Sequence, residues 1–329
     1  MALSTTFNPI GPVVRSGQGS ALGNREDLSD ALQLLAPEDT PLLSLCSKGK
    51  ASSTYAEWNI DRLSLPNTIG VAEGADATQF QDKFADRARL GNFTTKWRRT
   101  WSVSVEQNTV TTSAPANAAA SESKAMRELK RDIEATLLSD NEMTTENGAG
   151  VVSGLRGIGR WLQSTPQATN PVPTPYLTPA GSIMLAAPTE PTFNDLIASV
   201  FSKNGEMNSL TAICGLTVRK RITEFMRSDN NAGEQVYNIM QNADEKKVTL
   251  SCKLFDSDFG IVTMINGNPE CMPSPSRGYL INPKFLAFNT LIPMSSVRLQ
   301  NQGGGERGYI ECIGTLLMKH PQSAAKIAY

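Results

Sequence analysis

Residues 116–140 read ANAAASESKAMRELKRDIEATLLSD and predict one long helix. At 1.5 Å per residue this helix would be roughly 38 Å long. Charged residues cover most of its surface, and one narrow apolar stripe recurs at helical spacing. The stripe consists of Ala119, Met126, Leu129, Ile133 and Leu137. A narrow stripe among so many charges favours a helix that lies across a sheet over one that is buried in a bundle.

The chain before this helix does not build a compact core. Residues 1–50 form a polar, turn-rich arm with two short helix signals. Asn24 can cap the first, which extends to Leu35. Thr40 and Pro41 begin the second, whose apolar surface includes Leu42 and Leu43. Both helices are too short to be stable alone in water, so each must dock on its own body or on another chain.

An extended segment, residues 51–105, follows the arm. Residues 54–60 and 92–105 alternate as strands do, and a polar stretch joins them. We therefore predict a β-hairpin with a long polar tip. One face of the second strand carries Phe93, Thr95, Trp97, Arg99, Trp101, Val103 and Val105. Because an isolated two-stranded hairpin is marginally stable, it packs either on its own core as an edge hairpin or on a neighbouring subunit.

The chain after the long helix reads first as irregular and then as compact α/β. Residues 148–159 are glycine-rich, and residues 163–191 are rich in proline, threonine and alanine. Helix signals follow at 192–203 and 217–227, and strand signals at 210–214, 247–253, 260–265 and 278–288. Two further strands, 296–300 and 308–317, flank Gly303-Gly304-Gly305 and predict a hairpin.

Composition limits the class of protein. The 329 residues suffice for about two domains, and 40% of them are hydrophobic. A formal net charge of -1 argues against a dedicated nucleic-acid binder, although it allows a local basic patch. Neither a membrane span nor a secretory signal is visible, so we expect an intracellular chain. The cysteines, Cys46, Cys214, Cys252, Cys271 and Cys312, have irregular spacing and favour free buried thiols.

None of the motifs that would indicate a catalytic or ligand-binding site is complete. The glycines at 148–159 fit no nucleotide-loop register and follow a helix instead of a strand. Asp258-Phe259-Gly260 lacks every other part of a kinase, and Asp256 with Asp258 starts no complete calcium loop. His320 is the single histidine, and no nucleophile motif points to it. We expect no catalytic residue, cofactor or metal.

The order of these elements resembles the major capsid (head) proteins of tailed bacteriophages with the HK97-like fold. Short segments also resemble a subgroup of phage head proteins: Asn24-Arg25-Glu26-Asp27-Leu28, Asp39-Thr40-Pro41-Leu42-Leu43-Ser44, Glu57-Trp58 and Gly154-Leu155-Arg156-Gly157-Ile158. The resemblance implies an α+β fold with an N-terminal arm (1–50), an extended loop (51–105), a peripheral domain (106–191) with its spine helix (116–140), an axial α/β domain (192–294) and returning peripheral strands with the C-terminus (295–329).

This resemblance implies a structural subunit that self-assembles, through pentamers and hexamers, into the icosahedral head around a phage genome. Implied partners are other copies, scaffolding, portal and decoration proteins, and packaged double-stranded DNA. Assembly would occur in the host cytoplasm. Alternatives are a phage decoration, neck or tail protein, or a soluble two-domain α/β enzyme. The residues expected to form contacts between subunits are Leu42, Leu43, Trp97, Arg98, Arg99 and Trp101.

Overall fold

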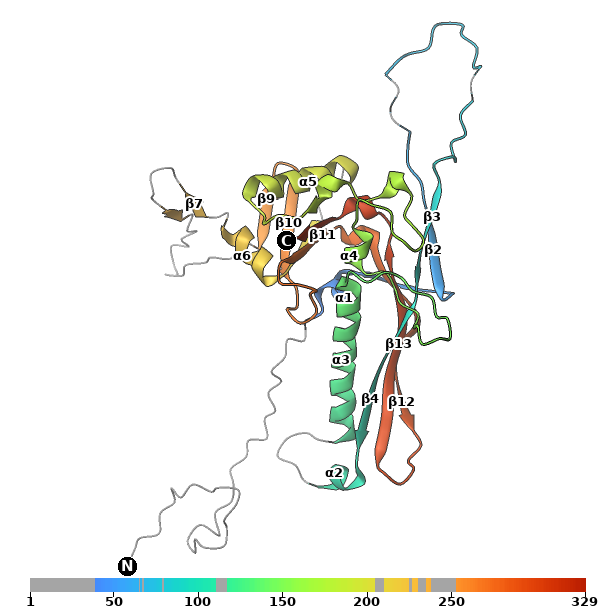
Figure 1. Cartoon of the computed structure of the whole chain (residues 1–329), viewed down its shortest axis with the longest axis vertical. Helices are drawn as coiled ribbons and strands as arrows, with labels where there is room; N and C mark the ends of the chain where they lie inside the picture. Colours follow the sequence, from blue (N-terminus) through green and yellow to red (C-terminus); the bar gives the residue numbers. More distant parts are fainter. Residues whose placement is uncertain are drawn as a thin grey trace, which may run out of the picture.

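A computed structural model describes residues 39–64, 66, 68–78, 80–110, 117–204, 210–224, 227–229, 235–237 and 253–329. The helix predicted at 24–35 and nearly all of the strand predicted at 247–253 lie outside these residues. Two sheets organise the rest: one of four strands, ordered β1-β12-β13-β4, and one of six strands, ordered β5-β14-β11-β6-β10-β9. In Figure 1 the six-stranded sheet lies in a compact body and the four-stranded sheet in an elongated one, and a long loop projects beyond both.

The helices are α1 (Pro41–Leu45), α2 (Val105–Thr109), α3 (Ala118–Leu138), α4 (Ile158–Trp161), α5 (Glu190–Asn204) and α6 (Leu216–Glu224). The strands are β1 (Ser47–Lys50), β2 (Tyr55–Ile60), β3 (Ala88–Phe93), β4 (Thr95–Val103), β5 (Ile183–Met184), β6 (Leu210–Cys214), β7 (Arg227–Asp229), β8 (Gln235–Tyr237), β9 (Leu254–Ser257), β10 (Gly260–Asn266), β11 (Arg277–Ile281), β12 (Leu286–Leu299), β13 (Glu306–Met318) and β14 (Ala325–Ala328).

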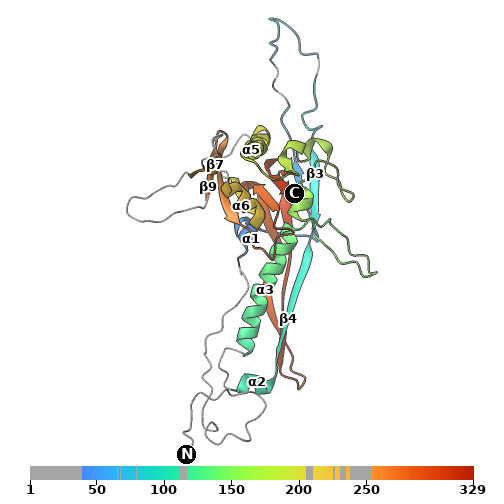
Figure 2. The ribbon, with the colours of Figure 1, turned by 60° about the vertical axis from the view of Figure 1, so that its left-hand side comes forward.

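Helix α3 is the predicted long helix, and it lies along the four-stranded sheet (Figure 2). Asn117 caps it by accepting a hydrogen bond from the amide of Ala120 at 2.9 Å. The side chains of Leu129, Ile133 and Leu137 are buried, as the apolar stripe predicts. The helix therefore packs one face on a sheet and leaves the other to solvent.

The four-stranded sheet is built around the long antiparallel pair β12 and β13, which pair from Leu286↔Met318 to Leu299↔Arg307. Strand β4 pairs with the other edge of β13, and the short β1 runs parallel to the start of β12. The glycine turn predicted at 303–305 connects β12 to β13. This sheet and α3 make one elongated, two-layered body.

The long strand predicted at 92–105 is two strands that belong to different sheets. Strand β3 pairs with β2, whereas β4 pairs with β13. The change occurs at Thr94, whose amide donates to the carbonyl of Thr54 at 2.8 Å. Residue alternation continues through a change of partner, so the sequence pattern alone could not reveal it. Val105, which was expected in this strand, begins α2.

The six-stranded sheet carries a second core under α5 and α6, formed by Phe193, Ile197, Val218 and their neighbours. The division of the strands between the two sheets does not coincide with the domain boundary expected at 294/295. Strand β12 already enters the four-stranded sheet at Leu286, and the C-terminal β14 returns to the six-stranded sheet between β5 and β11. The chain thus crosses between the two sheets on each side of the β12–β13 hairpin, in addition to its earlier crossing between β4 and β5.

Candidate assembly surfaces

The loop between β2 and β3, residues 61–87, projects from the body of the molecule (Figure 1). Its large apolar side chains face solvent, and Leu63 and Phe80 are 95% and 88% exposed. The other exposed apolar side chains of the loop are Ile69, Val71 and Phe84. Large apolar side chains that are exposed within one projecting loop are typical of contact surfaces.

Ion pairs close the base of this loop and leave its tip acidic. Arg62 pairs with Asp86 at 3.0 Å, and Arg87 pairs with Asp61 at 3.3 Å. Toward the tip are Glu73, Asp76 and Asp82, with Lys83 as the only described cation beside them. The projecting loop therefore combines apolar side chains with a net negative charge.

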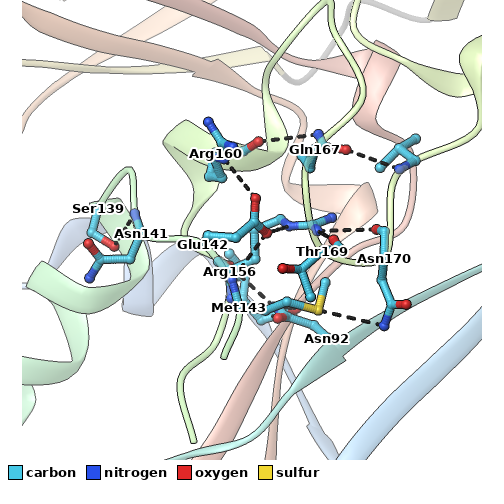
Figure 3. Close-up of polar contacts among 12 residues, drawn as sticks. Asn92, Ser139, Asn141, Glu142, Met143, Arg156, Arg160, Gln167, Thr169 and Asn170 are labelled. Carbon is cyan, nitrogen blue, oxygen red and sulfur yellow. Dashed lines mark hydrogen bonds and ion pairs between the residues drawn. The ribbon is translucent and has the colours of Figure 1, made fainter. Parts of the chain in front are cut away.

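The hairpin that carries the loop is anchored at its base by Asn92 of β3 (Figure 3). The Asn92 amide nitrogen donates to the carbonyls of Leu316 and Arg156, at 2.9 and 3.2 Å. Its side-chain oxygen accepts from the amide of Arg156 at 2.7 Å. One buried side chain thus connects the hairpin to β13 and to the segment before α4.

Arg156 continues this anchor into a buried ionic network (Figure 3). Its guanidinium, which is fully buried, donates from Nε to Glu142 Oε1 at 2.7 Å and from Nη2 to the carbonyls of Thr169 and Asn170. The ring of Trp161 lies 4.7 Å from its guanidinium carbon. Asn170 in turn donates to the hydroxyl of Tyr55 on β2, at 2.9 Å. The network therefore returns to the hairpin.

Glu142 balances the charges of this network. Its second carboxylate oxygen accepts from Arg160 Nε at 2.8 Å. Burial opposes ionisation of Glu142, but the two guanidinium groups outweigh it and lower the pKa of the carboxyl group. The carboxylate consequently stays ionised and holds both arginines in place.

The end of the arm is fastened to α3 by Glu134. The amides of Leu42 and Leu43 donate to Glu134 Oε1 and Oε2, each at 2.8 Å. These amides lie in the first turn of α1 and have no acceptor within the helix, and the side chain of Thr40 does not cap them. Burial, against the effect of both donors, raises the pKa of Glu134. A fully buried carboxylate of the long helix thus caps a helix of the arm.

The face of the four-stranded sheet that points away from α3 is open to solvent. We call it the outer sheet face and define it by Lys96, Arg98, Val297, Tyr309 and Glu311, which the strand register places on one side. Glu311 pairs with Lys96 at 3.0 Å and with Arg98 at 2.5 Å, and both cations lower its pKa. The guanidinium carbon of Arg98 lies 4.6 Å from the centre of the Tyr309 ring.

The structure places the six predicted contact residues in different surroundings. Leu42 is fully buried and Leu43 partly buried beside α3. Trp97 and Trp101 are only 7% and 6% exposed, under α3. Arg99 pairs with Asp132 of α3 at 2.5 Å, whereas Arg98 lies on the outer sheet face. A role for these residues between subunits stays a prediction, and within the chain five of them contribute to packing or pairing with α3.

Sequence reasoning missed the residues that fix the hairpin and the arm, namely Asn92, Glu134, Glu142 and Arg156. Glu134 carried a usable signal, because it lies between Ile133 and Leu137, two residues of the buried stripe of α3. The other three lie in irregular segments or beside a strand break, where no periodicity marks them.

The motifs that were set aside have structural roles. Asp258 lies in the turn between β9 and β10, and Gly260 there has a φ of 133°. The ring of His320 lies 5.3 Å from that of Phe285, and burial lowers its pKa. Within the described residues, no group of three or more histidines, cysteines or carboxylates could hold a metal ion. No helix of the described segments is long and apolar enough to cross a membrane.

The profile of one protein family, the SU10 major capsid protein, matches residues 5–329. The chain belongs to this family. It is therefore a structural protein that forms the shell of a phage particle, and it is not an enzyme. No curated protein matches the chain.

Solved structures of phage and phage-like particles share the fold of this capsid subunit. A chain of the cyanophage P-SCSP1u capsid superposes with a TM-score of 0.61 and 12% identity, over 99% of each chain. A capsid chain of a native GTA particle gives 0.60 and 12%, over 96% of this subunit and 98% of that chain. A chain of Gordonia phage Cozz gives 0.58 and 14%, over 98% of both. The expected HK97-like α+β fold is confirmed.

Proposed function

We propose that this capsid subunit assembles, through pentamers and hexamers, into closed icosahedral heads in the bacterial cytoplasm, and that its arm and loop 61–87 lie over adjacent subunits. The observation that carries this proposal is the loop itself, which holds Leu63, Phe80 and Phe84 in solvent outside the body of the chain. Packaged double-stranded DNA, and scaffolding, portal and decoration proteins, are the proposed further partners.

We propose that the loop docks on the outer sheet face of the next copy. The loop tip carries Glu73, Asp76 and Asp82, whereas the outer sheet face has two cations, Lys96 and Arg98, that share the single carboxylate of Glu311. Val297 and Tyr309 give this face an apolar centre. Opposite charges around apolar side chains favour a specific contact, and the charges chiefly fix its register.

Many weak contacts of this kind suffice for a stable shell. A phenylalanine side chain buries about 150–250 Å² when it is covered, and apolar area contributes about 25 cal/mol per Å². Two phenylalanines per loop thus supply several kcal/mol before the entropy of ordering the loop is subtracted. Each subunit in a closed shell makes such contacts with more than one neighbour. The free energies of the individual contacts therefore add up and stabilise the shell.

The experiment is electron microscopy of the purified protein and of the double variant Phe80→Ser/Phe84→Ser. We expect the wild type to form closed shells and the variant to remain as subunits or isolated capsomers with an unchanged melting temperature, because both side chains lie outside the folded body. The control variant Phe80→Leu/Phe84→Leu keeps the apolar area and should still assemble. A wild-type protein that forms only tubes, or a stable monomer even with its scaffolding partner, would contradict the proposal.

A further inference from the structure

A cavity lies where the six-stranded sheet meets the segment that follows α4, and we call it the junction cavity. Its volume is about 500 Å³, which is within the range of small-molecule sites. Its walls come from residues 162–165, from β5 and the residue after it, from the start of β11 and from β14 with Tyr329. The cavity therefore has walls from both bodies of the subunit.

Two cations of the six-stranded sheet line this cavity and share one carboxylate. Asp140, just beyond α3, accepts from Arg277 Nη2 at 2.6 Å and from Lys326 Nζ at 2.7 Å. Lys326 also donates to the carbonyl of Gly159 at 2.7 Å and is only 7% exposed. An ammonium group has a third donor, and a guanidinium group has several besides the one that Arg277 uses here. Within the described residues, both cations thus keep donors for a further acceptor.

The ionic groups around α4 carry an excess of positive charge. Four cations share two carboxylates in the described ion pairs, which are Arg156 and Arg160 with Glu142, and Arg277 and Lys326 with Asp140. Burial lowers the pKa of Lys326, and the neighbouring guanidinium groups lower it further, against the effect of its carboxylate partner. Because buried charges are normally balanced, this excess favours an anion as a further partner.

Other parts of the wall supply uncharged donors and an apolar surface. Ser164 and Thr165 are exposed, and their hydroxyl groups have no partner in the part of the chain that the structure describes. Leu185, which is 75% exposed, adds an apolar side chain. The main-chain oxygen of Tyr329 accepts from Ser276 Oγ, so this acceptor already has a donor.

We propose that the junction cavity binds a phosphate group, either as inorganic phosphate or as part of a small phosphate monoester. A phosphate monoester carries about −1.5 to −2 charges at pH 7, which matches the positive excess better than the single charge of a carboxylate does. Guanidinium and ammonium groups both form charge-assisted hydrogen bonds to phosphate oxygens. The remaining volume and the side chain of Leu185 provide room for an organic group.

A bound phosphate would connect the two bodies of the subunit. The cations that hold it belong to β11 and β14, whereas the hydroxyl groups of Ser164 and Thr165 belong to the segment after α4. A ligand that binds only the folded protein stabilises it in proportion to the logarithm of its concentration. We therefore expect the melting temperature to rise with phosphate concentration. This site does not depend on how the subunits assemble.

The test is isothermal titration calorimetry of the full-length protein with inorganic phosphate and with phenyl phosphate, at an ionic strength kept constant with sodium chloride. The variant Ser164→Glu places a negative charge at the cavity without removing a described ion pair, and Ser164→Gln is its uncharged control of the same shape. We expect the wild type and Ser164→Gln to bind phosphate, and Ser164→Glu to bind it about tenfold more weakly or worse, because like charges repel at short distance.

A second variant, Lys326→Met, removes the buried donor and should abolish binding. Its melting temperature without phosphate reports separately on folding, and if it does not fold, the Ser164 pair decides. Tighter binding of phenyl phosphate would support a monoester as the ligand, and equal binding of both probes would support inorganic phosphate. Absence of binding by both probes, equal affinities of the wild type and Ser164→Glu, or an equal rise in melting temperature with sodium chloride would each overturn the inference.

Discussion

Glu134 shows how one side chain joins two distant parts of the chain. It lies fully inside the protein, it accepts two amides of the arm, and its burial is not compensated by a described ion pair. Both carboxylate oxygens are needed, one for each amide. Glutamine at this position would have one oxygen and one NH₂ group. The NH₂ group would face one of the two backbone amides, so that two donors would meet.

The variant Glu134→Gln should therefore release α1 from α3 at neutral pH. We expect a loss of about 1–3 kcal/mol in the local stability of α1, the cost of a buried amide without an acceptor. Hydrogen exchange at Leu42 and Leu43 measures this directly, with the amides of β12 as an internal reference. Unchanged protection at both amides would show that the carboxylate does not hold the arm.

The same residue gives a pH dependence with a definite sign. Because the folded protein raises the pKa of Glu134 above its ordinary value of 4.5, the folded state holds a proton that the unfolded state has lost. Its contribution to the free energy of unfolding is fully present below the unfolded pKa and is lost as pH rises through the folded pKa. Urea unfolding of wild type and Glu134→Gln across this range should show the fall in the wild type only.

Arg156 is the second residue whose removal can be predicted sharply. The variant Arg156→Lys keeps the charge but loses the fork that binds Glu142 and the carbonyls of Thr169 and Asn170 together. We expect a loss of about 2 kcal/mol or more in the free energy of unfolding. The control Arg62→Lys changes a pair that is exposed to solvent, and it should cost much less, because solvent screens such pairs. Equal effects in denaturant titrations would contradict a special role for the buried network.

At the scale of elements, the hairpin β2–β3 depends on close packing at Gly91. A Cβ atom at this position would overlap the ring of Tyr55, the residue that receives the hydrogen bond from Asn170. The variant Gly91→Ala should shift Tyr55, weaken the hairpin by about 1–3 kcal/mol and raise amide exchange along β2. Gly70 has open space around it, so Gly70→Ala is the matched control and should leave exchange unchanged.

The elements also show what sequence can and cannot predict here. Helix α3 and the β12–β13 hairpin were predictable, because periodicity over many residues and a glycine turn report local structure directly. The division of residues 92–105 at Thr94 was not, because strand partners are chosen by segments far away in the chain. The anchor formed by Asn92 and Arg156 was equally invisible, since these two residues are 64 positions apart.

At the scale of the whole molecule, the two sheets are fastened to each other at several points. The hydroxyl of Tyr279 on β11 donates to the carbonyl of Leu138 at the end of α3, at 2.9 Å. Asp140 binds Arg277 at 2.6 Å and Lys326 at 2.7 Å, from β11 and β14. The two chain crossings at either end of the β12–β13 hairpin also touch, through a 2.9 Å bond from Lys319 to Phe285. The two sheets are thus joined by contacts both from the end of α3 and from the ends of the β12–β13 hairpin.

This bracing has a mechanical consequence for a shell that must be both curved and closed. A subunit whose long helix packs along a long two-stranded hairpin resists bending. In the proposed shell, pentamers and hexamers would require different angles between neighbouring subunits. If the proposed contacts form, the subunit keeps its shape while the angles between copies change, and the slender loop at residues 61–87, which projects from the body, would accommodate that difference.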